Sequence, residues 1–396
     1  MIESPSGQPK DNDPSQSLTL RPASSFAQID KTVWNDLATA NGRAYNPFIS
    51  YDFLKLLEDS GSCTRETGWL SYPLLLERGD TVIGVAPAYI KGHSQGEYIF
   101  DHHWADAYHR AGGQYFPKLL IASPFSPVPG PRLLCENDAD TIAFAGAIAQ
   151  LTEQMNLSSA HVNFCLNTEQ DAMSEQGFLP RIGEQYHWFN RDYSSFDDFL
   201  SALSSRKRKT IRQERRKAVS DGISIVNLKG SEITESHWDH FWVFYQDTGA
   251  RKWGTPYLTR ESFSMLGERM ADDVLLTLAF EGASPEPIAG ALHMIGGDAL
   301  YGRYWGATQR AKFLHFECCY YQAIDYAIEH KLARVEAGAQ GHHKIARGYE
   351  PCPTYSAHYI PDPGFRRALE AYLDQERRET EADITALKDY TPFRKP

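Results

Sequence analysis

A short segment punctuated by glycine, residues 338–349, holds the densest group of reactive side chains in the sequence. Its polar members include His342, His343, Lys344, Arg347 and Tyr349. Glycine at three positions of the segment allows the backbone to turn sharply or to approach a ligand closely. Titratable groups on a loop after a buried strand are typical of an active site, and we interpret the segment in that way. The alternative is a surface loop with ordinary solvated charges.

A carboxylate, Glu336, lies just before this segment, on a short strand expected at residues 333–337. We expect flanking helices to bury this strand, and an unpaired buried carboxylate is costly. Lys344 or Arg347 is therefore its expected partner. Burial can also raise the pKa of a carboxyl group, so Glu336 is a candidate general base.

Residues 205–217 form a strongly basic run, with eight basic residues and one acidic residue. In a chain of net charge -11 this run is unusual. It favours a site for a phosphate-bearing ligand, such as an acyl-CoA, an aminoacyl-tRNA end or a nucleotide-linked acceptor. The alternative is a solvated helix face. The candidate phosphate-binding residues are Arg206, Arg208, Lys209 and Arg212.

Several polar and aromatic residues lie on or after predicted strands or open predicted helices, where substrate clefts are commonly built. They are Asp101, Trp104, Tyr115, Lys118, His187, Tyr304, Trp305, His315 and Tyr349. A proline-rich stretch at residues 124–132 follows the first of them and is expected to form a rigid loop. The alternative is that these residues belong to long connections packed on the core.

Other chemistries find little support. The sequence lacks the GxxxxGK[ST] and HExxH patterns of P-loop and zincin proteins. Histidines are adjacent at 102–103 and 342–343, and neighbouring side chains on a strand point to opposite faces. We therefore predict no metal site.

Composition favours a globular protein of two domains, because 396 residues exceed one typical core. No run approaches the roughly 18 apolar residues of a membrane span. Residues 1–17 are polar and lack the apolar core of a secretory signal, which predicts a disordered leader on a cytoplasmic protein. The six cysteines show no CxxC spacing and are interpreted as reduced thiols.

The elements that must position these residues occur in the same order twice. Strands are expected at 69–77 and 81–91, with a third at 97–100, and again at 274–281, 288–295 and 299–305. A helix and a strand follow each set, as in 314–330 and 333–337. This order predicts an α+β fold with an N-terminal domain at 18–192, a basic helical linker at 193–222 and a C-terminal domain at 223–396.

Several segments resemble a known family, the FemAB-like predicted N-acyltransferases, a peptidoglycan biosynthesis/recognition branch of the GNAT acyltransferase superfamily. The resemblance spans about residues 46–360. Residues 341–344 read Gly-His-His-Lys where the family usually shows Gly-Glu-His-Lys. The segments that carry the resemblance are 46–48, 96–101, 115–118, 185–188, 206–209, 300–306, 314–317 and 336–341.

The resemblance implies tandem GNAT-like domains and transfer of an acyl group to an amine. The donor would be an acyl-CoA or an aminoacyl-tRNA, with no tightly bound cofactor. Glu336 or His343 would then be the base, and Lys344 or Arg347 would stabilise the oxyanion. The alternative is a catalytically inert double-GNAT module that binds a cell-wall precursor or a protein partner. The oligomeric state stays open.

Overall fold

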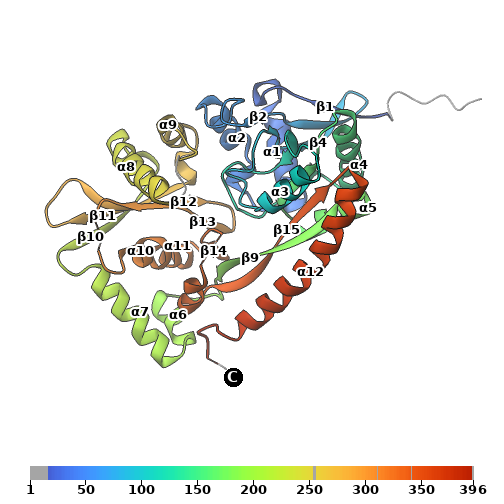
Figure 1. The fold of residues 1–396 in the computed structure, drawn as a ribbon. Helices are drawn as coiled ribbons and strands as arrows, with labels where there is room; N and C mark the ends of the chain where they lie inside the picture. Colours follow the sequence, from blue (N-terminus) through green and yellow to red (C-terminus); the bar gives the residue numbers. More distant parts are fainter. Residues whose placement is uncertain (1–16, 253–255, 310, 340, 395–396) are drawn as a thin grey trace, which may run out of the picture.

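The computed structural model describes residues 17–252, 256–309, 311–339 and 341–394, so almost all of the predicted leader lies outside the described residues. Helices and strands alternate along the chain (Figure 1). The strands are β1 (Leu18–Pro22), β2 (Trp69–Ser71), β3 (Leu74–Arg78), β4 (Thr81–Ala86), β5 (Ala88–Lys91), β6 (Lys118–Ile121), β7 (Leu134–Cys135), β8 (Ala160–Cys165), β9 (Leu179–Phe189), β10 (Ile223–Lys229), β11 (Val274–Glu281), β12 (Pro287–Ile295), β13 (Ala299–Ala307), β14 (Arg334–Glu336) and β15 (Glu350–Tyr359).

The α-helices cover these strands. They are α1 (Lys31–Thr39), α2 (Tyr51–Asp59), α3 (His102–Arg110), α4 (Asp138–Gln154), α5 (Asn167–Glu175), α6 (Phe196–Ala202), α7 (Ser205–Ala218), α8 (Glu235–Lys252), α9 (Arg260–Arg269), α10 (Leu314–Phe316), α11 (Gln322–Glu329) and α12 (Pro363–Lys388). A π-helical turn at Glu317–Tyr321 joins α10 to α11. Within the described residues, no helix is both long and apolar enough to cross a membrane.

One large sheet runs through the molecule. In the described part of the chain it has eleven strands, in the order β10-β11-β12-β13-β14-β9-β15-β8-β6-β5-β2, and β1-β3-β4-β7 form a second sheet. β15 comes from the end of the chain but lies between β9 and β8 of the first half. The two halves therefore share one sheet, and the division at residues 193–222 remains a prediction.

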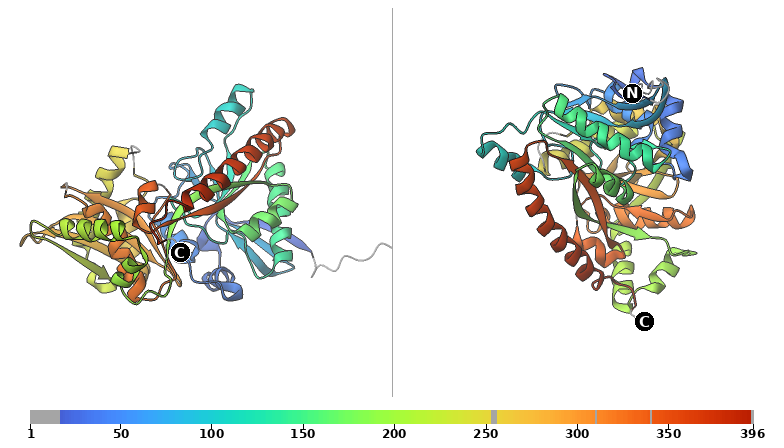
Figure 2. Two further views of the ribbon diagram at one scale, coloured as in Figure 1. Left: turned by 90° about the horizontal axis from the view of Figure 1, so that it is seen from below. Right: turned by 90° about the vertical axis from the view of Figure 1, so that its right-hand side faces the viewer.

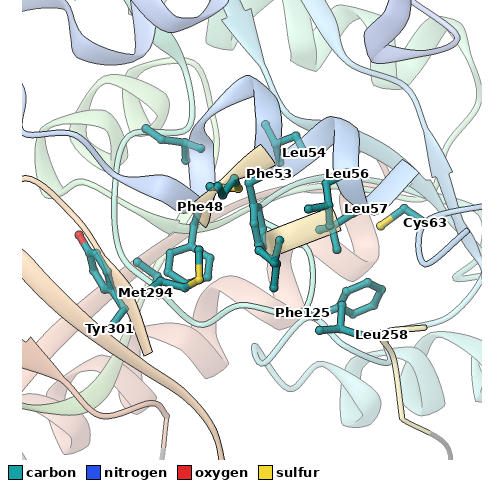
Figure 3. Packing of buried hydrophobic residues seen from close by; sticks show 14 of the residues in the cluster. Phe48, Phe53, Leu54, Leu56, Leu57, Cys63, Phe125, Leu258, Met294 and Tyr301 are labelled. Carbon is teal, nitrogen blue, oxygen red and sulfur yellow. The ribbon is translucent and has the colours of Figure 1, made fainter. Parts of the chain in front are cut away.

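The main hydrophobic core also draws on both halves. Phe48 and Phe53 from the first half lie beside Met294, Tyr301 and Leu258 from the second (Figure 3). The rings of Phe48 and Tyr301 meet edge to face, with 5.4 Å between their centres. This shared core holds the halves against each other and fixes the ends of β13 and of the loop after β6.

Most predicted elements are confirmed. The predicted helix at 314–330 corresponds to α10, the π-helical turn and α11, and Ser195 caps α6 by accepting a hydrogen bond from the amide of Asp198. The strand predicted at 97–100 was wrong. Lys118 binds the carboxylate of Glu97 at 2.9 Å, and Tyr98 has a φ of 60°. A buried ion pair thus determines the path of the chain there.

The last helix, α12, packs along β9 and β15, and α3 projects beside its N-terminal end (Figure 2). Arg181 on β9 forms a two-pronged ion pair with Glu376 of α12, at 2.7 and 2.8 Å. The Arg181 guanidinium also lies 5.0 Å from the centre of the Trp104 ring on α3. Through these contacts the end of the chain supports the sheet of the first half.

Candidate functional site

Strands β13 and β14 pair over a short distance and then separate. The pairs are Ala299 with Arg334, Leu300 with Val335 and Tyr301 with Glu336. β14 ends there, whereas β13 continues to Ala307. At the point of separation, a Cβ atom on Gly302 would lie 3.4 Å from the carbonyl oxygen of Glu336, so the two backbones approach closely. The reactive segment at 338–349 begins where this pairing stops.

Five of the predicted site residues, Trp305, His315, His343, Arg347 and Tyr349, meet around the start of the helical segment after β13. The rings of His315 and Trp305 lie 5.3 Å apart, and those of His315 and His343 lie 6.4 Å apart. Nε2 of His343 is 3.0 Å from the hydroxyl of Tyr320. We call Trp305, His315, Phe316, Tyr320 and His343 the histidine cluster.

The remaining two of those five residues pack against this cluster. The guanidinium of Arg347 lies 3.4 Å from the centre of the Phe316 ring. The ring of Tyr349 lies 5.5 Å from that of Tyr320. Phe316 and Tyr320 were not among the predicted site residues. Their four-residue spacing from each other on a predicted helix next to His315 was the signal that could have identified them.

Lys344 is a buried cation beside the histidine cluster. Its side chain is only 2% exposed, and Nζ donates a hydrogen bond to the carbonyl of Gly338 at 2.9 Å. Burial lowers the pKa of Lys344 to about 7. No carboxylate forms an ion pair with it among the described residues. Lys344 can therefore be charged or neutral near neutral pH.

The expected partner of Glu336 was wrong. Its Oε1 accepts a hydrogen bond from Nε of Arg334 at 2.8 Å, two residues earlier on the same strand, where side chains point to the same face. Arg334 also binds Asp298. Oε2 of Glu336 lies 3.9 Å from Nε2 of His187 and accepts no hydrogen bond within the described part of the chain.

Arg347 binds Glu214 of α7 instead, with Nη2 2.9 Å from Oε1. Arg215, the next residue of α7, binds Glu317 at 2.8 Å and Asp325 at 2.6 Å. These ion pairs fix α7 against the helical segment that carries the histidine cluster. The basic helix and the reactive segment are thus neighbours.

The four candidate phosphate-binding residues lie on the outer side of α7. Arg206, Lys209 and Arg212 are exposed, and Arg208 is half-buried. Arg212 forms an exposed ion pair with Asp197 at 2.7 Å. Ile211, Glu214 and Ala218 form the buried side of the helix. The predicted alternative, a solvated helix face, is consistent with the same exposure, so phosphate binding stays a prediction.

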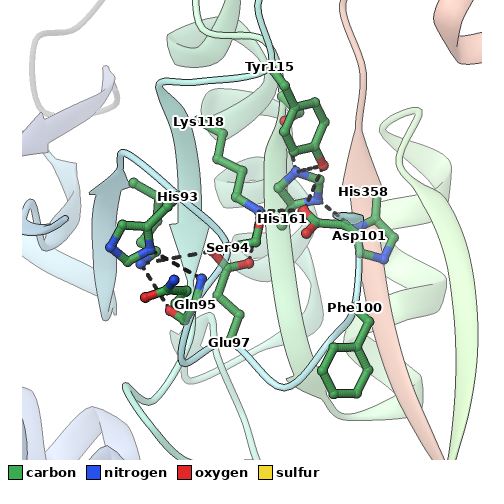
Figure 4. Close-up of polar contacts among 12 residues, drawn as sticks. His93, Ser94, Gln95, Glu97, Phe100, Asp101, Tyr115, Lys118, His161 and His358 are labelled. Atoms are coloured by element: carbon green, nitrogen blue, oxygen red, sulfur yellow. Dashed lines mark hydrogen bonds and ion pairs between the residues drawn. The ribbon is translucent and has the colours of Figure 1, made fainter. Parts of the chain in front are cut away.

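Asp101, Tyr115 and Lys118 belong to a second group, buried in the first half (Figure 4). Lys118 donates hydrogen bonds to Ser94 and Glu97, each at 2.9 Å, and to Asp101. Although burial lowers the pKa of Lys118, the two carboxylates more than offset this effect and raise it. Burial raises the pKa of Glu97 to about 7.

The hydroxyl of Tyr115 extends this group by donating to Asp101 at 2.7 Å, and it lies 3.2 Å from Nε2 of His161. The opposite nitrogen of His161, Nδ1, lies 2.7 Å from Nδ1 of His358 on β15. Trp104 packs edge to face on His358, with 4.9 Å between ring centres. The group is almost fully enclosed, so it fixes α3 and the loop before it.

The group that contains Glu336 and the histidine cluster does not meet the buried group around Lys118. Glu336 pairs with His187 on β9, whereas Trp104 contacts Arg181, six residues earlier on the same strand. Six residues of a strand span about 20 Å. Tyr304 lies apart from both groups, near Phe125. The hydroxyl of Tyr304 donates a hydrogen bond to the carbonyl of Phe125 at 3.4 Å. The predicted substrate residues are therefore distributed over three places.

Residues 92–96 read Gly-His-Ser-Gln-Gly and match the G-x-S-x-G pattern of serine hydrolases. That pattern needs a sharp turn between a strand and a helix. Here no helix follows β5 until α3, and Ser94 accepts a hydrogen bond from Lys118. Both ring nitrogens of His93 contact backbone groups. The segment therefore lacks the geometry of a hydrolase nucleophile.

No group of three or more His, Cys, Asp or Glu side chains is placed to hold a metal ion among the residues that the structure describes. Arg303 and Ser126, which were not predicted, lie together between the two halves.

Comparisons with known proteins bear on the fold and on the family of the chain. The fold matches that of FemX with a TM-score of 0.55 and 13% identity, over 86% of this chain and 98% of FemX. It also matches the C-terminal domain of a putative lysylphosphatidylglycerol synthetase from Agrobacterium fabrum, with a TM-score of 0.51, 12% identity and coverage of 89% and 97%. These two matches confirm the predicted α+β fold of Fem type.

A tandem GNAT protein from the clavulanic acid biosynthesis pathway is a weaker match, with a TM-score of 0.46, 13% identity and coverage of 88% and 99%. No curated protein matches the sequence. The model of the FemAB-like family, described as peptidoglycan biosynthesis/recognition, matches residues 25–395. The chain therefore belongs to the FemAB-like family.

Proposed function

We propose that this protein transfers an acyl or aminoacyl group from a thioester or ester donor to an amine acceptor at the histidine cluster. One observation carries the proposal: buried Lys344 and exposed His343 are adjacent where β13 and β14 separate. The resemblance to FemAB-like N-acyltransferases, a family whose model the chain matches, suggests the reaction that these two groups would serve.

In this reaction the amine nitrogen attacks the carbonyl carbon of the donor, and the amine must lose a proton. His343 is the proposed base, because it is exposed and its Nε2 is oriented by the hydroxyl of Tyr320. The carbonyl oxygen becomes an oxyanion, which the charged form of Lys344 would stabilise. A cation acts more strongly in such a buried place than in water. The leaving thiolate or alkoxide then takes the proton from His343.

Glu336 and Arg347 take supporting roles in this proposal. The carboxylate of Glu336 is bound by Arg334, and the charge of Arg347 is balanced by Glu214. Arg347 also stacks on Phe316 and so positions the ring next to His315. The exposed charges of α7, held beside this segment by the same ion pair, would bind the phosphates of the donor.

The donor is an acyl-CoA or an aminoacyl-tRNA. FemX is a fold match, and the sequence lacks the Gln/Arg-x-x-Gly-x-Gly/Ala pattern by which many GNAT proteins bind pyrophosphate. The experiment is to incubate the protein with CoA thioesters or charged tRNA and a panel of amines, and to detect the amide by mass spectrometry. Amide formation with one donor class supports the proposal. Tight binding of a donor without any amide product would favour the inert binding module.

A further inference from the structure

A small cavity between the two halves is lined mostly by apolar side chains. Its volume is about 20 Å³, which is enough for about one group of the size of a water molecule. The residues around it are Phe48, Phe53, Pro124, Ser126, Leu258, Leu266, Leu292, Met294, Arg303 and Tyr304. Figure 3 shows Phe48, Phe53, Leu258 and Met294 packed together at this seam. Among the described residues that line it, Arg303 alone is cationic.

Arg303 reaches the cavity because β13 has a bulge. Leu292 of β12 pairs with Tyr304 and His293 pairs with Gly302, so Arg303 is an extra residue in β13. Such bulges redirect a side chain and are frequent beside functional sites. The guanidinium lies 5.4 Å from the centre of the Phe48 ring and donates a hydrogen bond to the carbonyl of Phe125.

The charge of Arg303 is not balanced. Among the described residues no carboxylate forms an ion pair with it, and it contacts the Phe125 carbonyl and the rings of Phe48 and Tyr304. A guanidinium has five N–H donors, and the hydrogen bond to the Phe125 carbonyl uses one of its nitrogens. A partly buried cation with apolar neighbours and no counter-ion favours the binding of an anion.

Ser126 supplies a second, independent donor at the same cavity. It is only 3% exposed, and its hydroxyl has no hydrogen-bond partner within the described part of the chain. Buried hydroxyls without a partner are uncommon and need an explanation. A guanidinium and a hydroxyl that line one cavity are both donors to the oxygen atoms of a carboxylate.

We infer that Arg303 and Ser126 bind a carboxylate of the amine acceptor, so that the acceptor is an amino acid or a peptide-like amine with a free carboxylate. The identification of the bound molecule as the acceptor rests on the proposed function, whereas the binding of a carboxylate does not. Tyr304 packs with Leu292 on the seam side of β13, whereas Trp305 packs with Leu314 on the other side. The acceptor and the histidine cluster would thus approach each other from opposite faces where β13 and β14 separate.

The test measures anion binding at Arg303 without any donor or turnover. Protein labelled with nitrogen-15 in arginine is titrated with acetate, with its neutral analogue acetamide and with inorganic phosphate. The Nε signal of Arg303 is assigned as the signal that Arg303→Gln removes, and Arg303→Lys serves as a second variant if Arg303→Gln does not fold. Arg260→Gln is the matched control, because Asp239 and Glu235 already balance that charge.

We expect a saturable shift of the Arg303 signal with acetate and none with acetamide, unchanged in Arg260→Gln. Ser126→Ala should weaken acetate binding severalfold. A response to phosphate alone would overturn the assignment of a carboxylate. The absence of any saturable response, or an equal response to acetamide, would overturn the site and leave Arg303 as a structural link to Phe125. Acetate binding in a protein that makes no amide would contradict the proposed function alone.

Discussion

The guanidinium of Arg347 lies 2.9 Å from a carboxylate oxygen of Glu214, so the glycine-punctuated segment is ion-paired with the basic helix α7. Tyr321 donates a hydrogen bond to the same carboxylate. Both Arg347 and Glu214 are less than a tenth exposed. This pair therefore couples the proposed donor surface to the proposed catalytic residues.

Glu214→Gln should destabilise the protein by about 3 kcal/mol, because it leaves Arg347 buried without a counter-charge. Urea unfolding at neutral pH measures this loss. Arg212→Gln is the control on the same helix, where an exposed pair with Asp197 contributes about 0–1 kcal/mol. Equal losses in the two variants would mean that the buried pair has no special role.

The triple variant Arg208→Gln, Lys209→Gln and Arg212→Gln should weaken binding of the donor and flatten its dependence on salt, because phosphate contacts are screened by ions. Its thermal midpoint should change little. A triple glutamine variant at the exposed residues Arg110, Arg367 and Arg378 removes the same charge elsewhere. Unchanged donor affinity by calorimetry in the α7 variant would leave a solvated helix face.

Lys344→Met should change how stability depends on pH. Since the pKa of Lys344 is about 7 in the folded protein and near 10.4 in an unfolded chain, the unfolded state binds more protons between these values. The free energy of unfolding of the unmodified protein therefore receives an increasing contribution from Lys344 as pH rises from 7 to about 10.4. The Met variant should be the more stable one below pH 7, with an advantage that shrinks across this window.

Denaturant unfolding between pH 6 and 10 checks this expectation, with Lys217→Met at an exposed position as the control. The control should differ from the unmodified protein by a constant amount across the range. A constant difference for Lys344→Met as well would show that Lys344 keeps an ordinary pKa.

Asp101→Asn should destabilise the protein by about 3 kcal/mol at neutral pH, because Lys118 loses one of its two buried counter-charges. Although burial raises the pKa of Asp101, the neighbouring Lys118 and His161 lower it below its usual range. The contribution of Asp101 is therefore present above about pH 4 and is lost as pH falls. Asp106→Asn, at an exposed position of α3, should have almost no effect on the urea midpoint.

The sequence was sufficient for the elements with clear local signals. Ser195 predicted the start of α6, and the apolar periodicity of 314–330 predicted the helical segment, although not its π-helical turn. The partner of Glu336 was missed because a strand places Arg334 and Glu336 on one face, a choice that spacing along the loop does not reveal. The bulge that directs Arg303 to the seam depends on the register between β12 and β13, which a single sequence does not encode locally.

The most direct test of the account compares His343→Gln with His342→Gln in one single-turnover assay of amide formation, with donor and amine saturating. His342 is adjacent in sequence and exposed, and it contacts Tyr186 rather than the histidine cluster. If His343 is the base, His343→Gln should slow the reaction by roughly 10²-fold or more, and His342→Gln should leave the rate within a fewfold of the unmodified protein. A His343→Gln protein that reacts at the normal rate, or equal slowing by both variants, would contradict the assignment of the histidine cluster as the site of acyl transfer.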